Sequence, residues 1–216
     1  MNFNWTDNAV MRGLGRLCDF MILNLLWIVF SIPLFTIGAS TTALYAVTLK
    51  IVKNEEGYIF KGFLVAFKDN FKQATLLWLP LSALGIILII NFNLIGQFES
   101  PGIRIAFQII FTIMSVLLVF VLMYVFPLIA RYENTFKQSI QNALLLSIAR
   151  LPYTILLLLV GAVAVVLTLV HPPLAIFIWM IGGVAILAWI NSAILRKAFS
   201  MMDPKEEEEK EEGEEE

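Results

Sequence analysis

Four stretches of this chain carry no charged side chain for more than 25 residues each: 20–49, 73–98, 105–130 and 151–195. A helix needs about 20 predominantly apolar residues to cross the hydrocarbon core of a bilayer. Hydrophobic residues make up 59% of the chain and charged residues 15%, against roughly 45–50% and 25% in ordinary globular domains. The sequence therefore predicts an all-α fold, that of a polytopic helical membrane protein.

The lengths of the uncharged runs predict five transmembrane helices. We expect the first over 17–37, the second over 74–95 and the third over 105–129. The fourth run, 151–195, would be about 67 Å long as one helix at 1.5 Å per residue, which is too long for one crossing. We expect His171-Pro172-Pro173 to divide it into two spans.

A competing hypothesis concerns the first run. Residues 20–49 could instead form a hairpin or re-entrant pair that breaks between Pro33 and Gly38, with both ends on one side. Its two arms would have about 15 residues each, which is short for a crossing. We therefore expect a single span.

Lysine and arginine gather in 40–73, in 130–151 and after the last span, whereas 96–103 and 171–173 contain neither. Basic segments stay in the cytoplasm, so we expect these segments and the C-terminus on the inner face of a bacterial plasma membrane. An odd number of spans then places the N-terminus outside, although Arg12 and Arg16 argue against that side.

Two segments before predicted spans have an apolar stripe at helical spacing. We expect them to be amphipathic cytoplasmic helices that lie in the membrane interface or dock a partner; the simpler interpretation is that they anchor the inner face of the bundle. The candidate interfacial residues are Phe60, Phe63, Phe67, Phe71, Lys61, Lys68 and Lys72 in the first segment and Phe136 and Lys137 in the second.

The two segments also resemble each other. Phe71-Lys72-Gln73-Ala74 is echoed by Phe136-Lys137-Gln138-Ser139, and each copy precedes a pair of predicted spans. This spacing suggests an internal repeat over 60–125 and 126–195 within a single domain, 1–203. Residues 204–216 hold nine glutamates and are expected to form a disordered, solvated tail.

Polar side chains are rare within the predicted spans. The candidates are Asp19, at the edge of the first span, and the amides Asn24, Asn91 and Asn191. Such amides usually join helices through hydrogen bonds. The scarcity of buried carboxylates argues against an ion-coupled transporter.

The chain has one cysteine, Cys18, and one histidine, His171. Metal sites and nucleophile–base pairs mostly need several such residues. The sequence therefore predicts no catalytic or metal site, no cofactor and no enzyme activity, and nothing in it resembles a nucleic-acid-binding module.

Several short motifs in residues 10–75 resemble the YesL family of small Gram-positive bacterial membrane proteins, which is a domain of unknown function. They are Asn24-Leu25-Leu26-Trp27, Thr36-Ile37-Gly38-Ala39, Ala43-Leu44-Tyr45 and Asn70-Phe71-Lys72, together with Pro33, Phe63 and Phe67. The resemblance implies a setting in carbohydrate utilisation and carries over no catalytic or binding residue.

Three hypotheses follow. The first is a non-enzymatic accessory protein of the membrane that works with a sugar transporter or its sensor kinase through the inner-face helices. The second is a carrier or export component in its own right. The third, a membrane enzyme, would need His171 or Asp19 in a pocket with a second reactive group. All three place the chain in a lipid bilayer and leave its oligomeric state open.

Overall fold

The computed structural model describes residues 9–55, 57–97 and 100–200, and every regular element in them is helical. The elements are α1 (Ala9–Ser31), the 3₁₀ turn η2 (Leu34–Thr36), α2 (Ile37–Val52), α3 (Ile59–Leu94), the 3₁₀ turn η3 (Ile95–Gln97), α4 (Pro101–Arg131), α5 (Phe136–Ala149), α6 (Leu151–Val170), α7 (Pro172–Ile178), the π-helix η4 (Trp179–Gly183) and α8 (Val184–Phe199). The all-α prediction is confirmed. The predicted tail 204–216 lies outside the described residues.

The expectation of one span over 20–49 is wrong, because these residues form the α1–α2 hairpin. Pro33 has no backbone N–H to continue α1, and the Thr36 hydroxyl donates to the carbonyls of Phe30 and Pro33 to close the turn. The arms are longer than the 15 residues expected because α1 begins at Ala9. Length and composition therefore make six helices, not five, candidates to cross a membrane.

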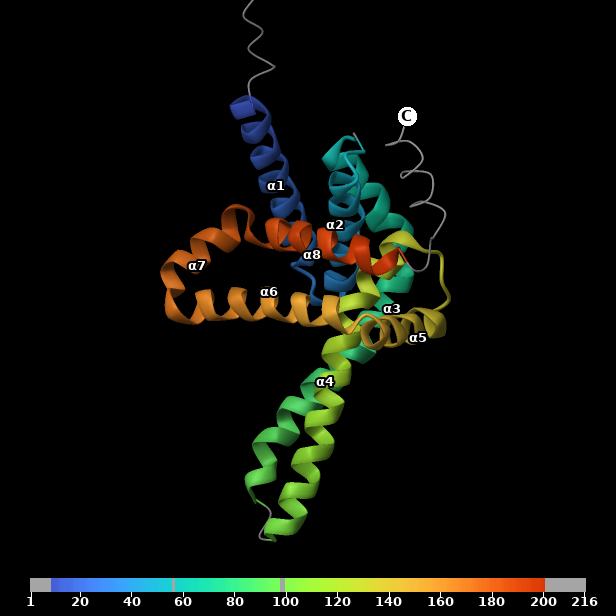
Figure 1. Cartoon of the computed structure of the whole chain (residues 1–216), viewed down its shortest axis with the longest axis vertical. Helices are drawn as coiled ribbons and strands as arrows, with labels where there is room; N and C mark the ends of the chain where they lie inside the picture. The colour runs from blue at the N-terminus through green and yellow to red at the C-terminus, as the bar shows by residue number, and fades with distance from the viewer. Residues whose placement is uncertain (1–8, 56, 98–99, 201–216) are drawn as a thin grey trace, which may run out of the picture.

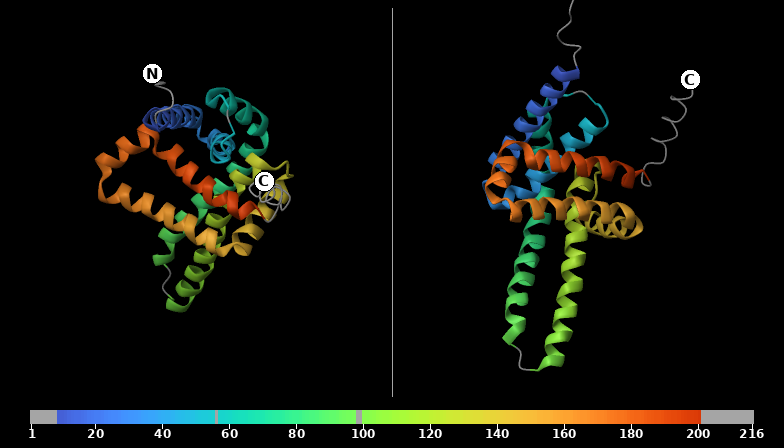
Figure 2. Two further views of the ribbon diagram at one scale, coloured as in Figure 1. Left: turned by 45° about the horizontal axis from the view of Figure 1, so that its top comes forward. Right: turned by 60° about the vertical axis from the view of Figure 1, so that its left-hand side comes forward.

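The long helices form two hairpins that diverge from a common centre. In Figure 1, the second half of α3 and α4 run down the lower part of the picture side by side, whereas α6 and α8 run across its middle. The same relation is visible from a second direction in Figure 2. The α1–α2 hairpin packs on the upper part of α3, so residues far apart in sequence meet near the centre.

Small side chains let α2 approach α3 closely. Gly38 is buried, and a Cβ atom there would lie 2.6 Å from the Cβ of Trp78 and 2.7 Å from the carbonyl oxygen of Ala74. The indole of Trp78 donates to the carbonyl of Leu34 at 2.8 Å, which fixes the α1–α2 turn to α3. Membrane helices associate through such small-residue contacts because lipid supplies no hydrophobic driving force between them.

A second core joins α4, α5 and α6. Tyr124 is fully buried, and its hydroxyl lies 2.8 Å from that of Thr154, which in turn donates to the carbonyl of Ser147 at 2.7 Å. Thr154 follows Leu151-Pro152, where the helical path breaks between α5 and α6. These bonds therefore fix the junction from which the α6–α8 hairpin leaves the rest of the molecule.

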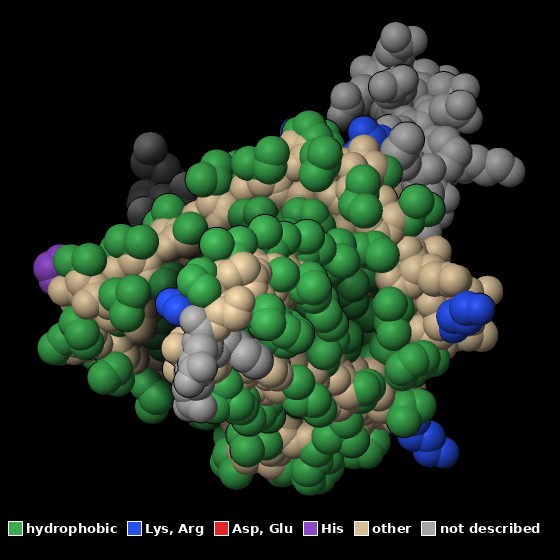
Figure 3. Space-filling view, turned by 90° about the horizontal axis from the view of Figure 1, so that it is seen from below, with side chains coloured by type: hydrophobic (Ala, Val, Ile, Leu, Met, Phe, Trp, Pro, Cys, Tyr) green, Lys and Arg blue, Asp and Glu red, His purple; other side chains and the backbone are tan. Residues whose placement is uncertain are grey.

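Most of the outer surface of the long helices is apolar. Ile89 on α3 and Ile105 on α4 each expose more than half of their area, as do Leu159 and Val163 on α6. Figure 3 shows hydrophobic side chains covering most of the face seen from below. A surface of this kind suits lipid rather than water, so these are the helices of a multi-pass membrane protein.

Candidate functional site

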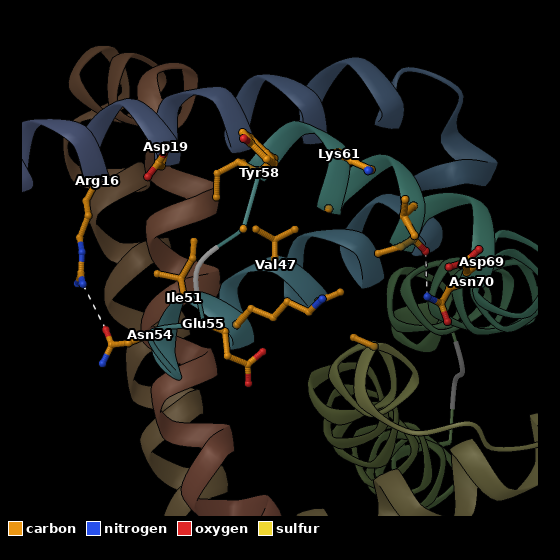
Figure 4. Close-up of a pocket in the computed structure, with 18 residues that line it drawn as sticks. Arg16, Asp19, Val47, Ile51, Asn54, Glu55, Tyr58, Lys61, Asp69 and Asn70 are labelled. Carbon is orange, nitrogen blue, oxygen red and sulfur yellow. Dashed lines mark hydrogen bonds between the residues drawn. The ribbon is translucent and has the colours of Figure 1, made fainter.

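A polar-lined cleft lies between the first half of α1, the end of α2 and the start of α3. It has a volume of about 830 Å³. Figure 4 shows α1 passing over the cleft, with the α2–α3 connection on its opposite side. The helices bring together residues from 16 to 70, and Ala130 at the end of α4 completes the wall.

Six charged side chains line this cleft: Arg16, Asp19, Lys50, Glu55, Lys61 and Asp69. Aliphatic side chains alternate with them, including Val47, Ile51 and Val65. The lining therefore offers both signs of charge beside an apolar wall. Such a surface suits an amphipathic ligand or a protein segment that carries charges of both signs.

The α2–α3 connection is shaped around Asn54. Its φ of 56° is left-handed, a conformation that asparagine tolerates better than most residues. Its N–H donates to the carbonyl of Ile51, and its side-chain oxygen accepts a hydrogen bond from the Arg16 guanidinium at 3.3 Å. Lys53 and Glu55 form an ion pair across the same turn at 3.9 Å. The hydrogen bond between Arg16 and Asn54 joins α1 to this turn at one edge of the cleft.

Most of the first predicted apolar stripe, Phe60 to Phe71, packs inside the protein. Phe63 is fully buried, and both it and Phe67 pack edge-on against Phe30 of α1 at centroid separations of 5.6 and 4.8 Å. The ring of Phe71 lies 5.4 Å from that of Phe67 and is tilted by 58° to it, whereas Phe60 is 58% exposed. The stripe belongs to α3 itself, which continues unbroken into the second span, so it is not a separate helix.

The lysines of that segment do not share one environment. Lys61 lines the cleft, whereas Lys68 and Lys72 are exposed on α3 and do not line it. Phe136 and Lys137 are exposed at the start of α5 and lie outside the cleft. The second predicted stripe runs from Ile129 to Leu144. It is split, because α4 ends at Arg131 and α5 begins at Phe136.

The two echoing segments touch each other. The amide of Gln73 on α3 donates to the carbonyl of Asn134 at 2.6 Å and to the hydroxyl of Ser139 at 3.1 Å. Thr135 and Gln138 form a capping box at the same helix start. Gln73 thus bonds the residues at the start of α5, a contact between the two segments that sequence similarity did not reveal.

Asn24 is the most completely bonded polar side chain among the apolar helices. It is fully buried, and its amide nitrogen donates to the carbonyls of Trp179 and Met180 at 2.9 and 3.0 Å. Its oxygen accepts from the N–H groups of Val184 and Ala185 at 3.1 and 3.3 Å. The π-helix interrupts the regular α-helical hydrogen bonding of this segment. Asn24 on α1 bonds two carbonyls and two N–H groups at the interruption.

The other predicted polar residues play smaller parts. Asn91 donates to the carbonyl of Ile87 one turn back on its own helix, and neighbouring Asn93 does the same. Asn191 on α8 donates to the hydroxyl of Tyr45 on α2 at 3.4 Å. Asp19 is half-buried at the cleft.

The sequence did not predict the contact between α2 and α8, a seam formed by Thr48, Ser192, Val52 and Arg196. Thr48 and Ser192 are fully buried and their hydroxyl oxygens lie 2.7 Å apart. Arg196 donates to the carbonyl of Val52 at 3.4 Å at the end of the same seam. Small hydroxyls within apolar runs are common in membrane helices, so only a tertiary contact distinguishes these.

The one histidine and the one cysteine of the chain do not line the cleft. His171 is exposed at the tip between α6 and α7, and Cys18 is exposed on α1. Within residues 9–55, 57–97 and 100–200 no group of three His, Cys, Asp or Glu side chains could hold a metal ion.

The comparisons with known proteins agree on one family. Residues 20–92 match the model of DUF624, a protein family of unknown function. The chain is similar to three proteins of Bacillus subtilis (strain 168), each described as uncharacterized: YesL, 26% identical over 94% of this chain and 97% of YesL; YteU, 32% identical over 70% and 71%; and YesV, 30% identical over 71% and 75%. No solved structure matches.

Proposed function

The chain belongs to the YesL-like DUF624 family, and within that family we propose that it is a non-enzymatic accessory protein of the plasma membrane that binds another membrane protein at its polar cleft. The observation that carries the proposal is the cleft itself. It interrupts a largely apolar surface with six charged side chains, one of which, Lys61, comes from the segment expected to dock a partner. A charged patch at the edge of an apolar helix bundle gives orientation and specificity to association.

The proposed partner is a component of a sugar transporter or its sensor kinase. The support for this choice is the carbohydrate setting implied by the family resemblance. The exposed Lys68 and Lys72 on α3 extend the charged surface beyond the cleft and would contact the same partner.

The proposed topology has six crossings with both termini in the cytoplasm. The basic segments then all lie inside: Arg12 and Arg16, the 50–61 turn, the 131–150 segment and Arg196. The turns that hold no lysine or arginine lie outside, at 32–36, 95–100 and 171. This removes the conflict that placed the N-terminus outside.

The hairpin of α6 and α8 provides a test of the six-crossing topology. A bilayer normal that follows α3 and α4 in Figure 1 leaves α6 and α8 along the membrane plane. His171 lies at the tip of this hairpin, so the side from which it is labelled decides whether α6 and α8 cross the bilayer. In a Cys18→Ser background, Asn54→Cys should label only from inside and Gly96→Cys and His171→Cys from outside. Inside labelling at position 171 would contradict six crossings.

Affinity purification of the tagged protein after mild detergent extraction tests the accessory function. Val65→Trp places a large side chain in the cleft, whereas Ile86→Trp places the same side chain at a similarly exposed position of α3 away from it. We expect a transporter or kinase component with the parent chain and with Ile86→Trp, and much less with Val65→Trp. Recovery of neither component with the parent chain would overturn the proposal.

A carrier or export component is the second candidate, because the cleft is large enough for a small solute and the suspected repeat over 60–125 and 126–195 is a feature of many carriers. Purified protein in liposomes would then move a solute, and Val65→Trp would stop that movement. A membrane enzyme ranks last, since His171 lies away from the cleft and Asp19 lines it without a histidine, cysteine, serine or threonine among the other described lining residues.

A further inference from the structure

The two parts of this chain carry opposite and nearly equal charge. Residues 9–200 contain 13 lysines and arginines and six acidic residues, an excess of seven positive charges. Residues 201–216 contain two lysines and ten acidic residues, an excess of eight negative charges. Apart from Arg104, the positive charges of the first part lie in the segments at one end of the proposed topology.

The end of α8 lies directly against that basic end. Phe199 is fully buried against the ring of Tyr132 at 6.0 Å, with the guanidinium of Arg131 5.7 Å from its own ring. Three residues earlier, Arg196 bonds the carbonyl of Val52 at the end of α2. The chain therefore leaves α8 between the ends of α2 and α4.

We propose that the acidic segment 203–216 binds within the same chain to a basic face formed at the ends of α2, α4 and α8. This basic face consists of Lys50, Lys53, Arg131, Arg196 and Lys197. The 16 residues after Ser200 reach about 50 Å when extended, so they span these helix ends easily. Their attachment to α8 gives them a high effective concentration at the face.

Two further charges select this face over its surroundings. Asp19 and Asp69 line the α1 and α3 sides of the cleft and repel glutamate, whereas Glu55 at the end of α2 is paired with Lys53 at 3.9 Å. The acidic segment is therefore directed to the α2–α8 side. The negative surface of the cytoplasmic leaflet repels the segment as well. The bound segment would lie beside Lys50 and so partly cover the cleft; its binding does not depend on the proposed function.

The test uses two spin labels in the full chain, in a Cys18→Ser background and in nanodiscs of phosphatidylcholine. One label is placed at Asn54→Cys in the α2–α3 turn and one at Gly213→Cys in the acidic segment. Pulsed dipolar spectroscopy should show a defined short distance at about 50 mM salt that broadens at about 500 mM, because the Debye length falls below about 5 Å. Replacing the nine glutamates of 206–216 by glutamine should abolish it at low salt.

Two controls make the outcome decisive. The triple variant Lys50→Gln, Lys53→Gln, Lys197→Gln should reduce the short-distance fraction, whereas Arg104→Gln, at the far end of the α3–α4 hairpin, should leave it unchanged. Mixing with an excess of unlabelled protein should also leave it unchanged. A broad distribution that is the same with glutamate and glutamine overturns the proposal, and loss of the short distance on mixing overturns binding within one chain.

Discussion

Replacing Asn24 by leucine tests how α1 is joined to the α7–α8 segment. Leucine has a similar volume but no polar atom, so two carbonyls and two N–H groups between Trp179 and Ala185 lose their partners. Side-chain hydrogen bonds between membrane helices contribute about 0.6 kcal/mol on average and up to about 1.7. Four contacts of 2.9 to 3.3 Å therefore predict a loss of about 2–4 kcal/mol in the free energy of unfolding.

Unfolding by denaturing detergent, followed by far-ultraviolet circular dichroism, measures this loss. Asn93→Leu is the matched control, because Asn93 is exposed and bonds only the carbonyl of Ile89 on its own helix. We expect the control to change the unfolding free energy by less than about 0.5 kcal/mol.

The π-helix at 179–183 provides a second readout. If the amide holds it in place, Asn24→Leu should also speed hydrogen exchange at Val184 and Ala185, whose N–H groups bond its oxygen. If Asn24→Leu and the control have equal unfolding free energies and equal exchange, the amide does not hold α1 to this segment and the reasoning fails.

Three further substitutions test the packing of the core. Gly38→Leu should prevent α2 from meeting Trp78 and cost more than about 3 kcal/mol, since backbone atoms cannot yield; the detergent unfolding midpoint would report it, and an unchanged midpoint would contradict the close approach. Tyr124→Phe leaves the hydroxyl of Thr154 with one partner fewer and should cost about 1 kcal/mol, an effect that a double-mutant cycle with Thr154→Val should show to be shared. Thr48→Val removes a buried hydroxyl pair with α8 and should lower the unfolding midpoint by an amount equivalent to about 1 kcal/mol; no change would mean that the seam does not stabilise the fold.

Much of the helix pattern follows from local sequence. The predicted second span lies in α3 and the first residue of η3, and the predicted third span lies in α4. The predicted division of 151–195 at His171-Pro172-Pro173 is the break between α6 and α7. The hairpin at 20–49 was only the competing hypothesis because the start of α1 carries Arg12 and Arg16, so counting uncharged residues truncated its first arm. Its turn at Pro33 was visible, but an arm of 15 residues looked too short to cross.

The cleft could not be predicted from the sequence. Arg16 and Asp19 come from one helix, Lys50 from a second and Lys61 and Asp69 from a third. In the sequence they mark only the ends of apolar runs. The fold places them around one cavity because Gly38 lets α2 lie close to α3 and the bond from Arg16 to Asn54 draws α1 to the turn.

The amino-acid sequence alone indicated a membrane environment, a helical fold and most of the points where helices end. Hydropathy and the missing N–H of proline act locally, so these features do not depend on tertiary contacts. Folding in three dimensions decided which faces meet. Leu23 is fully buried and Leu25, two residues on, is 61% exposed, although both are leucine in one helix. Lipid is as apolar as the protein interior, so hydrophobicity does not separate the two faces here. Shape and the few hydrogen bonds that apolar surroundings make costly to break decide it instead.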